Sequence, residues 1–326
     1  MTPGLSGPVR FTVDPWDPGY GIAFSEDPDD TALAESSAEL NLDVEFPAGQ
    51  WHPIAAPAGI SVPGTVLFLD GVRRIEAWVW VHGGDSDGVQ PSPGIAASVA
   101  VGLVTCNGTA KVDAVSVERG LFTAAPEVTD LVTRAVSYPA RMASGPGADQ
   151  LSLALQRRLS AAEVRLALSY RDQYSISGDL LVVDGPLRGR THLDRTVGYI
   201  KTHHASYLPG EQAGIVASLR PGERTPAFTI GTSWRRSTWY LRLPGAHGVP
   251  WSGVVRLECS ADLPPAEVIR LADITAAVLP PMASTPHKDP RAPQNLVPIG
   301  GLERRLRHML GDQEILYRSL RVAAAE

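Results

Sequence analysis

Two stretches of the sequence decide the fold class, Thr65-Val-Leu-Phe-Leu-Asp70-Gly71 and Asp179-Leu-Leu-Val-Val-Asp184-Gly185. Each is a short continuous run of apolar, β-favouring residues, which is typical of a strand buried on both faces. Each run is followed by Asp-Gly, a pair that either marks a turn or presents a carboxylate where the strand leaves the sheet. If the two strands lie in one sheet, Asp70 and Asp184 can meet at one edge and bind a divalent metal.

Composition sets limits on the class of protein. The chain has 326 residues, 44% of them hydrophobic, which is enough for a full core. We find no apolar run of membrane-spanning length and no signal peptide, and only two cysteines, Cys106 and Cys259. These features predict a cytoplasmic protein without a disulfide scaffold or a Cys-rich zinc site. A net charge of −6 argues against a surface covered in phosphate-binding charge but permits a local basic groove.

The chain divides into a Pro-, Gly- and Asp-rich extension, residues 1–60, and a main domain, residues 61–326. In the extension, residues 38–46 alternate with a period of two and predict one strand. Residues 65–119 predict an antiparallel meander, in which the strand ending at Asp70 turns through residues 71–74 into the next strand. Residues 126–173 are predicted to be helical.

Further elements follow the second Asp-Gly pair. Strands are predicted at residues 196–200, 227–230, 237–243 and 253–259, helices at 264–279 and 302–320, and loops over 205–235 and 280–298. The expected fold is therefore α/β, an antiparallel meander plus parallel strands in one mixed sheet flanked by helices.

Glu163 is the third candidate acid. Apolar residues recur every three or four positions from Leu151 to Leu166, and Glu163 falls on or beside this stripe, which faces the sheet. An inward carboxylate needs a partner or a metal. The alternative is that Glu163 lies at the border of the stripe and either pairs with Arg157 or Arg158 or extends to water.

Basic residues follow both Asp-Gly pairs. Lys201 follows the strand at 196–200, where it could contact phosphate or balance the acids. The arginines would place positive charge around a metal site, where a phosphate backbone could lie. The alternative for each is an ordinary solvated surface charge. The candidate DNA contacts are Arg73, Arg74, Arg188, Arg190 and Lys201.

The order of these elements resembles that of an RNase H-like domain, and at the level of residues the chain resembles the NurA nuclease family. The resemblance rests on Phe68-Leu-Asp70-Gly71, Glu163 on a helix, Leu181-Val-Val-Asp184-Gly-Pro-Leu187, Val197-Gly-Tyr-Ile-Lys201-Thr, Tyr240-Leu-Arg-Leu with Val255-Arg-Leu-Glu258, and a late histidine.

This resemblance implies a Mn²⁺-dependent nuclease, with Mg²⁺ as the other possible metal, that processes DNA ends. It also implies a homodimer that works with a HerA-type hexameric ATPase, in double-strand-break repair or in anti-phage defence. Asp70, Glu163 and Asp184 would be the metal-binding acids, and His287 the late catalytic residue, with Asp289 or Asn295 as alternatives. Two other functions stay open: a catalytically weak DNA-binding adaptor of the ATPase, and a hydrolase of RNA or hybrids.

Overall fold

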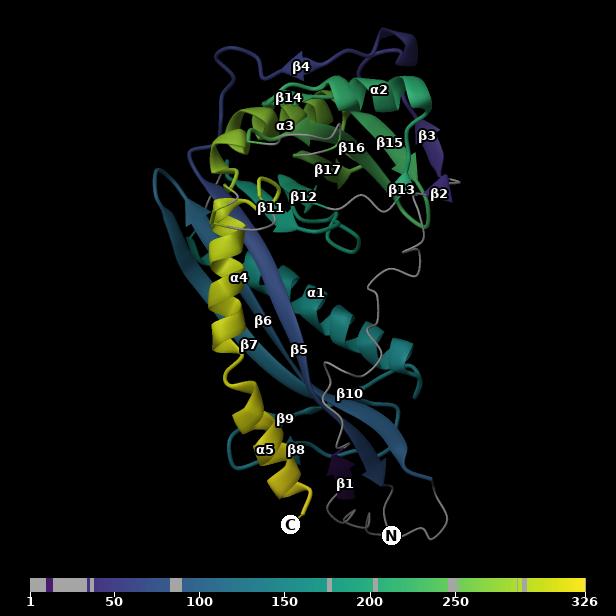
Figure 1. The fold of residues 1–326 in the computed structure, drawn as a ribbon, viewed down its shortest axis with the longest axis vertical. Helices are drawn as coiled ribbons and strands as arrows, with labels where there is room; N and C mark the ends of the chain where they lie inside the picture. The colour runs from purple at the N-terminus through teal and green to yellow at the C-terminus, as the bar shows by residue number, and fades with distance from the viewer. Residues whose placement is uncertain are drawn as a thin grey trace.

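The computed structural model describes residues 10–13, 34–35, 38–82, 90–174, 178–201, 205–245, 251, 253–285, 287–288 and 292–325. Over these residues the chain is an α/β fold in which helices flank one large mixed sheet (Figure 1). None of the helices in the described ranges is both long enough and apolar enough to cross a membrane.

The long meander forms one half of the sheet. It consists of β5 (Val66–His82), β6 (Ser92–Cys106) and β7 (Ala110–Thr123), which pair antiparallel in chain order. The other half contains β11 (Leu180–Asp184), β12 (Thr196–Ile200), β16 (Arg235–Arg242) and β17 (Val254–Ser260). β11 lies between β5 and β12 and runs parallel to both, so the apolar runs of the two Asp-Gly stretches are direct neighbours.

Short strands and short 3₁₀ helices complete the architecture. They are β1 (Arg10–Val13), β2 (Ala34–Glu35), β3 (Glu39–Asn41), η1 (Ala48–Gln50), β4 (Ile54–Ala55), β8 (Leu131–Val132), β9 (Ser137–Tyr138), β10 (Ala140–Met142), β13 (Ala205–Ser206), β14 (Glu223–Arg224), β15 (Phe228–Gly231) and η2 (Pro280–Met282). From the predicted N-terminal extension, β1 pairs with β5, β3 with β15 and β4 with β14.

Helices cover both faces of the meander. The helices are α1 (Ala148–Tyr174), α2 (Gly210–Ser218), α3 (Pro265–Val278), α4 (Val297–Met309) and α5 (Gln313–Ala323). On β6, Val101 packs in the cluster that contains Leu155 and Leu159 of α1, whereas a Cβ at the next residue, Gly102, would meet Leu302 of α4 at 2.7 Å. Because successive residues of a strand face opposite ways, α1 and α4 lie on opposite faces of the sheet.

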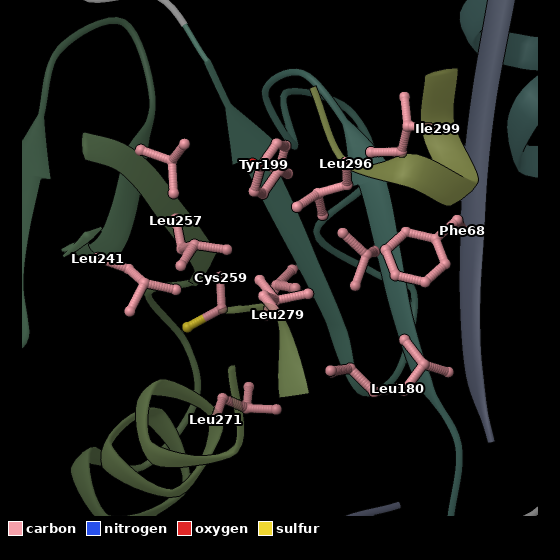
Figure 2. Packing of buried hydrophobic residues seen from close by; sticks show 14 of the residues in the cluster. Phe68, Leu180, Tyr199, Leu241, Leu257, Cys259, Leu271, Leu279, Leu296 and Ile299 are labelled. Atoms are coloured by element: carbon pink, nitrogen blue, oxygen red, sulfur yellow. The ribbon is translucent and has the colours of Figure 1, made fainter. Parts of the chain in front are cut away.

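The largest core cluster lies on the face covered by α3 and α4. Phe68 of β5, Leu180 of β11 and Tyr199 of β12 pack there with Leu296 and Ile299, as Figure 2 shows. The opposite face of the same strands carries Leu67, Leu69, Leu181 and Val183, which pack with Ala167 and Tyr170 of α1. The continuous apolar runs therefore predicted burial on both faces correctly.

One feature of the predicted meander is wrong. The sequence indicated a turn at residues 71–74, but β5 continues through Asp70 and Gly71 as one strand. Its partner β6 pairs with every residue from Val66 to Ile75, so long-range pairing overrides the local preference of Asp-Gly for a turn. At the second pair the prediction holds, because Gly185 has a φ of 95° and follows the end of β11.

Four further predictions need correction. Residues 126–147 are not helical; they contain β8, β9 and β10, and α1 begins only at Ala148, after a stretch rich in Pro and Gly. The predicted helix at 302–320 is two helices, since Gly311, with a φ of 83°, ends α4. The predicted loop at 205–235 contains α2, and the strand predicted at 38–46 is reduced to β3.

Candidate active site

Asp70 and Asp184 occupy equivalent positions on neighbouring parallel strands. Val183 of β11 is paired with Leu69 of β5, and each aspartate is the next residue on its strand. Neighbouring strands lie about 4.8 Å apart, and residues at one level of a parallel pair project to the same face. The alternation of buried residues places both aspartates on the face of Phe68 and Val182, toward the segment that leads into α4.

Asp70 is a buried carboxyl group close to other acids, and it is only 7% exposed. Burial raises its pKa well above the usual value, and repulsion from Asp184 and Glu163 raises it further. Lys201 and the backbone N–H of Gly71 lower it, the latter by donating a hydrogen bond of 2.7 Å to Oδ1. The carboxylates of Asp70, Asp184 and Glu163 therefore interact with one another, and a cation would relieve their repulsion.

Glu163 lies on the opposite face of the sheet from these aspartates, on the side of Gly71 and Val101. It lies on α1 and is 3% exposed. A Cβ atom at Gly71 would lie 2.8 Å from its Oε1 atom, so only glycine allows the carboxylate to approach the strand this closely. Burial raises the pKa of Glu163, Arg190 lowers it, and Asp184 raises it. Glu163 is thus a buried acid beside the strand position that follows Asp70.

Arg190 is the partner of Glu163. Its guanidinium forms an ion pair with Glu163 and donates to the carbonyl of Pro186 and to Ser160. Neither Arg157 nor Arg158, the partners considered from the sequence, takes this place. The predicted phosphate contact Arg190 is therefore buried against an acid, where it compensates the charge of Glu163.

Lys201 and Asn295 complete the site around Asp184. The Nζ atom of Lys201 donates to Asp184 Oδ2 at 2.7 Å and to Asn295 Oδ1 at 3.0 Å. The hydroxyl of Tyr199 donates to the carbonyl of Gln294 at 2.6 Å, which ties the segment before α4 to β12. Asn295, named from the sequence only as an alternative to His287, is fully buried at the site. His287 is exposed, and Asp289 lies outside the described residues.

The other predicted basic residues have different positions. Arg73 donates to Gln156 of α1 at 2.7 Å. Arg74 donates to the carbonyls of Leu310 and Gly311 at the end of α4, which stabilises that helix end. Arg188 is exposed. Arg73 and Arg74 thus donate hydrogen bonds within the protein, whereas the side chain of Arg188 is exposed to solvent.

A second buried charge cluster supports the loop that follows Asp184. Glu258 of β17 accepts a hydrogen bond of 2.7 Å from the backbone N–H of Leu187, and forms ion pairs with Arg236 and Arg256. The sequence contained one signal for it: Arg256 and Glu258 alternate with the apolar Val255 and Leu257 along one strand. The cluster fixes the turn that carries Arg190 toward Glu163.

The donor groups of the site suit a hard divalent cation. Across the ranges that the structure describes, no three His, Cys, Asp or Glu side chains are grouped so that they could hold a metal ion together. Mg²⁺ and Mn²⁺ sites, however, often use one or two carboxylates and take the remaining ligands from water and substrate phosphate. Asp70 and Asp184 fit that requirement, whereas Glu163 lies on the opposite face of the sheet and is paired with Arg190.

Comparisons with known proteins add a distant structural similarity. No family model matches the chain, and no curated protein matches it. Among solved structures, the crystal structure of the NurA nuclease from Sulfolobus solfataricus is similar at a TM-score of 0.42 and 12% sequence identity, over 80% of this chain and 86% of that chain. At these values the similarity does not show a shared family, and the function proposed below rests on the residues of the site.

Proposed function

We propose that the chain is a divalent-metal-dependent nuclease that hydrolyses phosphodiesters in DNA. The observation that carries this proposal is the placement of Asp70 and Asp184 side by side on β5 and β11, where burial and then repulsion from Asp184 raise the pKa of Asp70. Such a pair is costly without a cation, and it offers the oxygen ligands that Mn²⁺ and Mg²⁺ prefer. In this proposal Asp70 and Asp184 hold the metal, and Glu163, on the other face of the sheet, adds a negative charge near them.

Each residue of the site would have its own role in the hydrolysis. A bound divalent metal would activate water and stabilise charge on the scissile phosphate. Lys201 carries a positive charge beside Asp184, within reach of an anionic substrate. Asn295 orients Lys201 by accepting its second hydrogen bond. Burial raises the pKa of Glu163, and the ion pair with Arg190 opposes this effect.

The resemblance of the sequence motifs to the NurA family is the ground for the biological part of the proposal. The chain would process DNA ends as a homodimer together with a HerA-type hexameric ATPase, in double-strand-break repair or in anti-phage defence. Size-exclusion chromatography with light scattering tests the dimer. Co-purification with a HerA-type ATPase encoded near this chain tests the complex, and a monomer that does not bind the ATPase would contradict this part alone.

The nuclease activity is tested with end-labelled single- and double-stranded DNA in Mn²⁺. We expect cleavage by the wild type and by the control Asp172→Asn, which changes an exposed aspartate on α1. We expect no cleavage by Asp184→Asn, although the variant folds. Matched RNA and hybrid substrates distinguish a DNA nuclease from a hydrolase of RNA. Equal cleavage by Asp184→Asn and wild type would refute the assignment.

One observation favours a second candidate function, a catalytically weak DNA-binding adaptor. Glu163 and Asp184 are already neutralised by Arg190 and Lys201, as expected for a site in which cations of the protein replace a metal. DNA binding that is retained in EDTA, with no cleavage in Mn²⁺ or Mg²⁺ at any DNA end structure, would favour this adaptor.

A further inference from the structure

Lys201 forms a bridge between the candidate metal ligand Asp184 and the buried Asn295. Its Nζ atom donates to Asp184 Oδ2 at 2.7 Å and to Asn295 Oδ1 at 3.0 Å. The side chains of Lys201 and Asp184 are 18% and 16% exposed. Water and salt therefore screen this ion pair less than they screen a pair on the surface. The ammonium group is thus a positive charge held in place at the acid pair.

Two separate parts of the chain position this ammonium group. Lys201 directly follows β12, two residues after Tyr199, which pairs with Asp184 of β11. The hydroxyl of Tyr199 donates to the carbonyl of Gln294 at 2.6 Å, beside Asn295. Tyr199 also packs in one core cluster with Leu296, the residue after Asn295 (Figure 2). The strand therefore brings Lys201 to Asp184, and the segment before α4 keeps its second acceptor in place.

The charge of Lys201 acts on both aspartates of the pair. Burial and then repulsion from Asp184 raise the pKa of Asp70, and Lys201 lowers it. Without a metal, Lys201 offsets one of the two negative charges of Asp70 and Asp184. A metal ion that binds Asp184 would share its carboxylate with the ammonium group, and two cations at one carboxylate repel each other. Lys201 and a divalent metal are therefore alternative partners of Asp184.

We propose that Lys201 is a built-in counter-cation that competes with the divalent metal for Asp184. Lys201 compensates Asp184 in the metal-free protein, and a metal ion binds when the ammonium group leaves Asp184 Oδ2. Asn295 offers the displaced ammonium group an acceptor, because it already takes one of its hydrogen bonds. Lys201 thereby stabilises the protein without metal and lowers the metal affinity of the site. The inference rests on the proposed metal site at Asp70 and Asp184.

The test measures Mn²⁺ binding through the electron paramagnetic resonance signal of free Mn²⁺, in the absence of nucleic acid. We expect Lys201→Gln to bind Mn²⁺ at least about tenfold more tightly than the wild type, because a positive charge close to the metal is removed. Lys201→Arg keeps the charge and should bind no more tightly than the wild type. Lys111→Gln is the matched control: Lys111 pairs with Asp113 at 2.6 Å but is 78% exposed, so its affinity should equal that of the wild type.

Thermal melting of the same proteins separates this role from a purely structural one. In EDTA, Lys201→Gln should melt at a lower temperature than the wild type, because Asp70 and Asp184 lose their counter-charge. Saturating Mn²⁺ should remove this deficit, since a ligand that binds the folded state more tightly stabilises it more. A lysine that only supports the fold would lower the melting temperature equally in EDTA and in Mn²⁺, and that result would contradict the proposal.

The outcomes distinguish this inference from the metal site on which it rests. If the wild type binds Mn²⁺ and Lys201→Gln binds it equally or more weakly, the competition is overturned and the metal site stands. An equal gain in Lys111→Gln would also overturn the competition, since it would show a general effect of charge. Mn²⁺ binding by Lys201→Gln but not by the wild type would support the competition and favour the adaptor function. Absence of Mn²⁺ binding in every protein would overturn both proposals.

Discussion

The Oε1 atom of Glu163 lies 2.8 Å from the point where a Cβ atom of residue 71 would sit. Glu163 and Gly71 belong to different layers, and this close approach brings the acid of α1 next to the strand position that follows Asp70. A methyl group at residue 71 would also meet Leu159 at 2.6 Å and Val101 at 3.2 Å. Gly71 is therefore a positioning residue for Glu163.

The variant Gly71→Ala tests this relationship. We expect the added methyl group to displace Glu163 and Leu159, and to lower the free energy of unfolding by about 1–3 kcal/mol, as overpacking of a core does. We also expect the rate of Mn²⁺-dependent cleavage to fall. Denaturant unfolding and a cleavage assay measure the two effects.

Gly214→Ala is the matched control. Gly214 lies in α2, and a Cβ there would have open space, so the variant should gain about 0.5–1 kcal/mol from helix propensity. If Gly71→Ala behaves like this control in stability and cleavage, Gly71 has no positioning role.

The ion pair of Glu163 and Arg190 gives a second prediction. Replacing Arg190 with Gln leaves a buried carboxylate without its counter-charge, which costs about 3–5 kcal/mol at neutral pH. The double variant Glu163→Gln, Arg190→Gln should recover most of this loss, because it removes both charges. Urea unfolding of the four proteins of this cycle measures the coupling. Additive losses in the double variant would contradict a direct ion pair.

We expect the buried Glu76 to make the stability of the fold depend on pH, independently of the candidate active site. Burial raises its pKa from 4.5 to about 7, against the opposing effect of Arg74 and Arg119. The folded state holds the proton of Glu76 more tightly than the unfolded state does. The contribution of Glu76 to the free energy of unfolding is therefore largest below pH 4.5 and is lost as the pH rises toward 7. The loss over that window amounts to about 3 kcal/mol.

The variant Glu76→Gln should remove this decline, whereas Glu211→Gln, at an exposed position of α2, should keep it. Chemical denaturation across the pH range measures both. An unchanged pH profile in Glu76→Gln would show that Glu76 titrates at its ordinary value.

Much of this architecture could be predicted from the sequence. The strand Thr196–Ile200 was predicted with its observed ends, and the burial of β5 and β11 on both faces followed from their continuous apolar runs. The buried position of Glu163 followed from the helical period. These features depend on local pattern and burial, which a sequence carries directly.

The remainder depends on contacts between distant segments. Asp70-Gly71 has the local chemistry of a turn, and only its pairing with β6 keeps it within a strand. Arg190 follows Asp184 by six residues, but its approach to Glu163 depends on the loop that Glu258 holds from another strand. Asn295 accepts a hydrogen bond from Lys201, which lies 94 residues earlier in the sequence. The segment that contains Asn295 has no helix-like or strand-like pattern of apolar residues. No local pattern indicates such partners.

Asp70 yields a prediction about stability in the absence of metal. Burial and the neighbouring acids raise its pKa, so its ionised form destabilises the fold above the ordinary range of an aspartate. We therefore expect Asp70→Asn to raise the melting temperature in EDTA at neutral pH. A lower melting temperature in EDTA would show that Lys201 and Gly71 already compensate the charge of Asp70.

The central claim, that Asp70 and Asp184 hold a divalent metal, is tested most directly by Mn²⁺ binding followed through the electron paramagnetic resonance signal of free Mn²⁺. The wild type and Asp172→Asn should remove free Mn²⁺ from solution with the same affinity, and Asp70→Asn and Asp184→Asn should each lose this binding. Equal Mn²⁺ affinity in all four proteins would contradict the account.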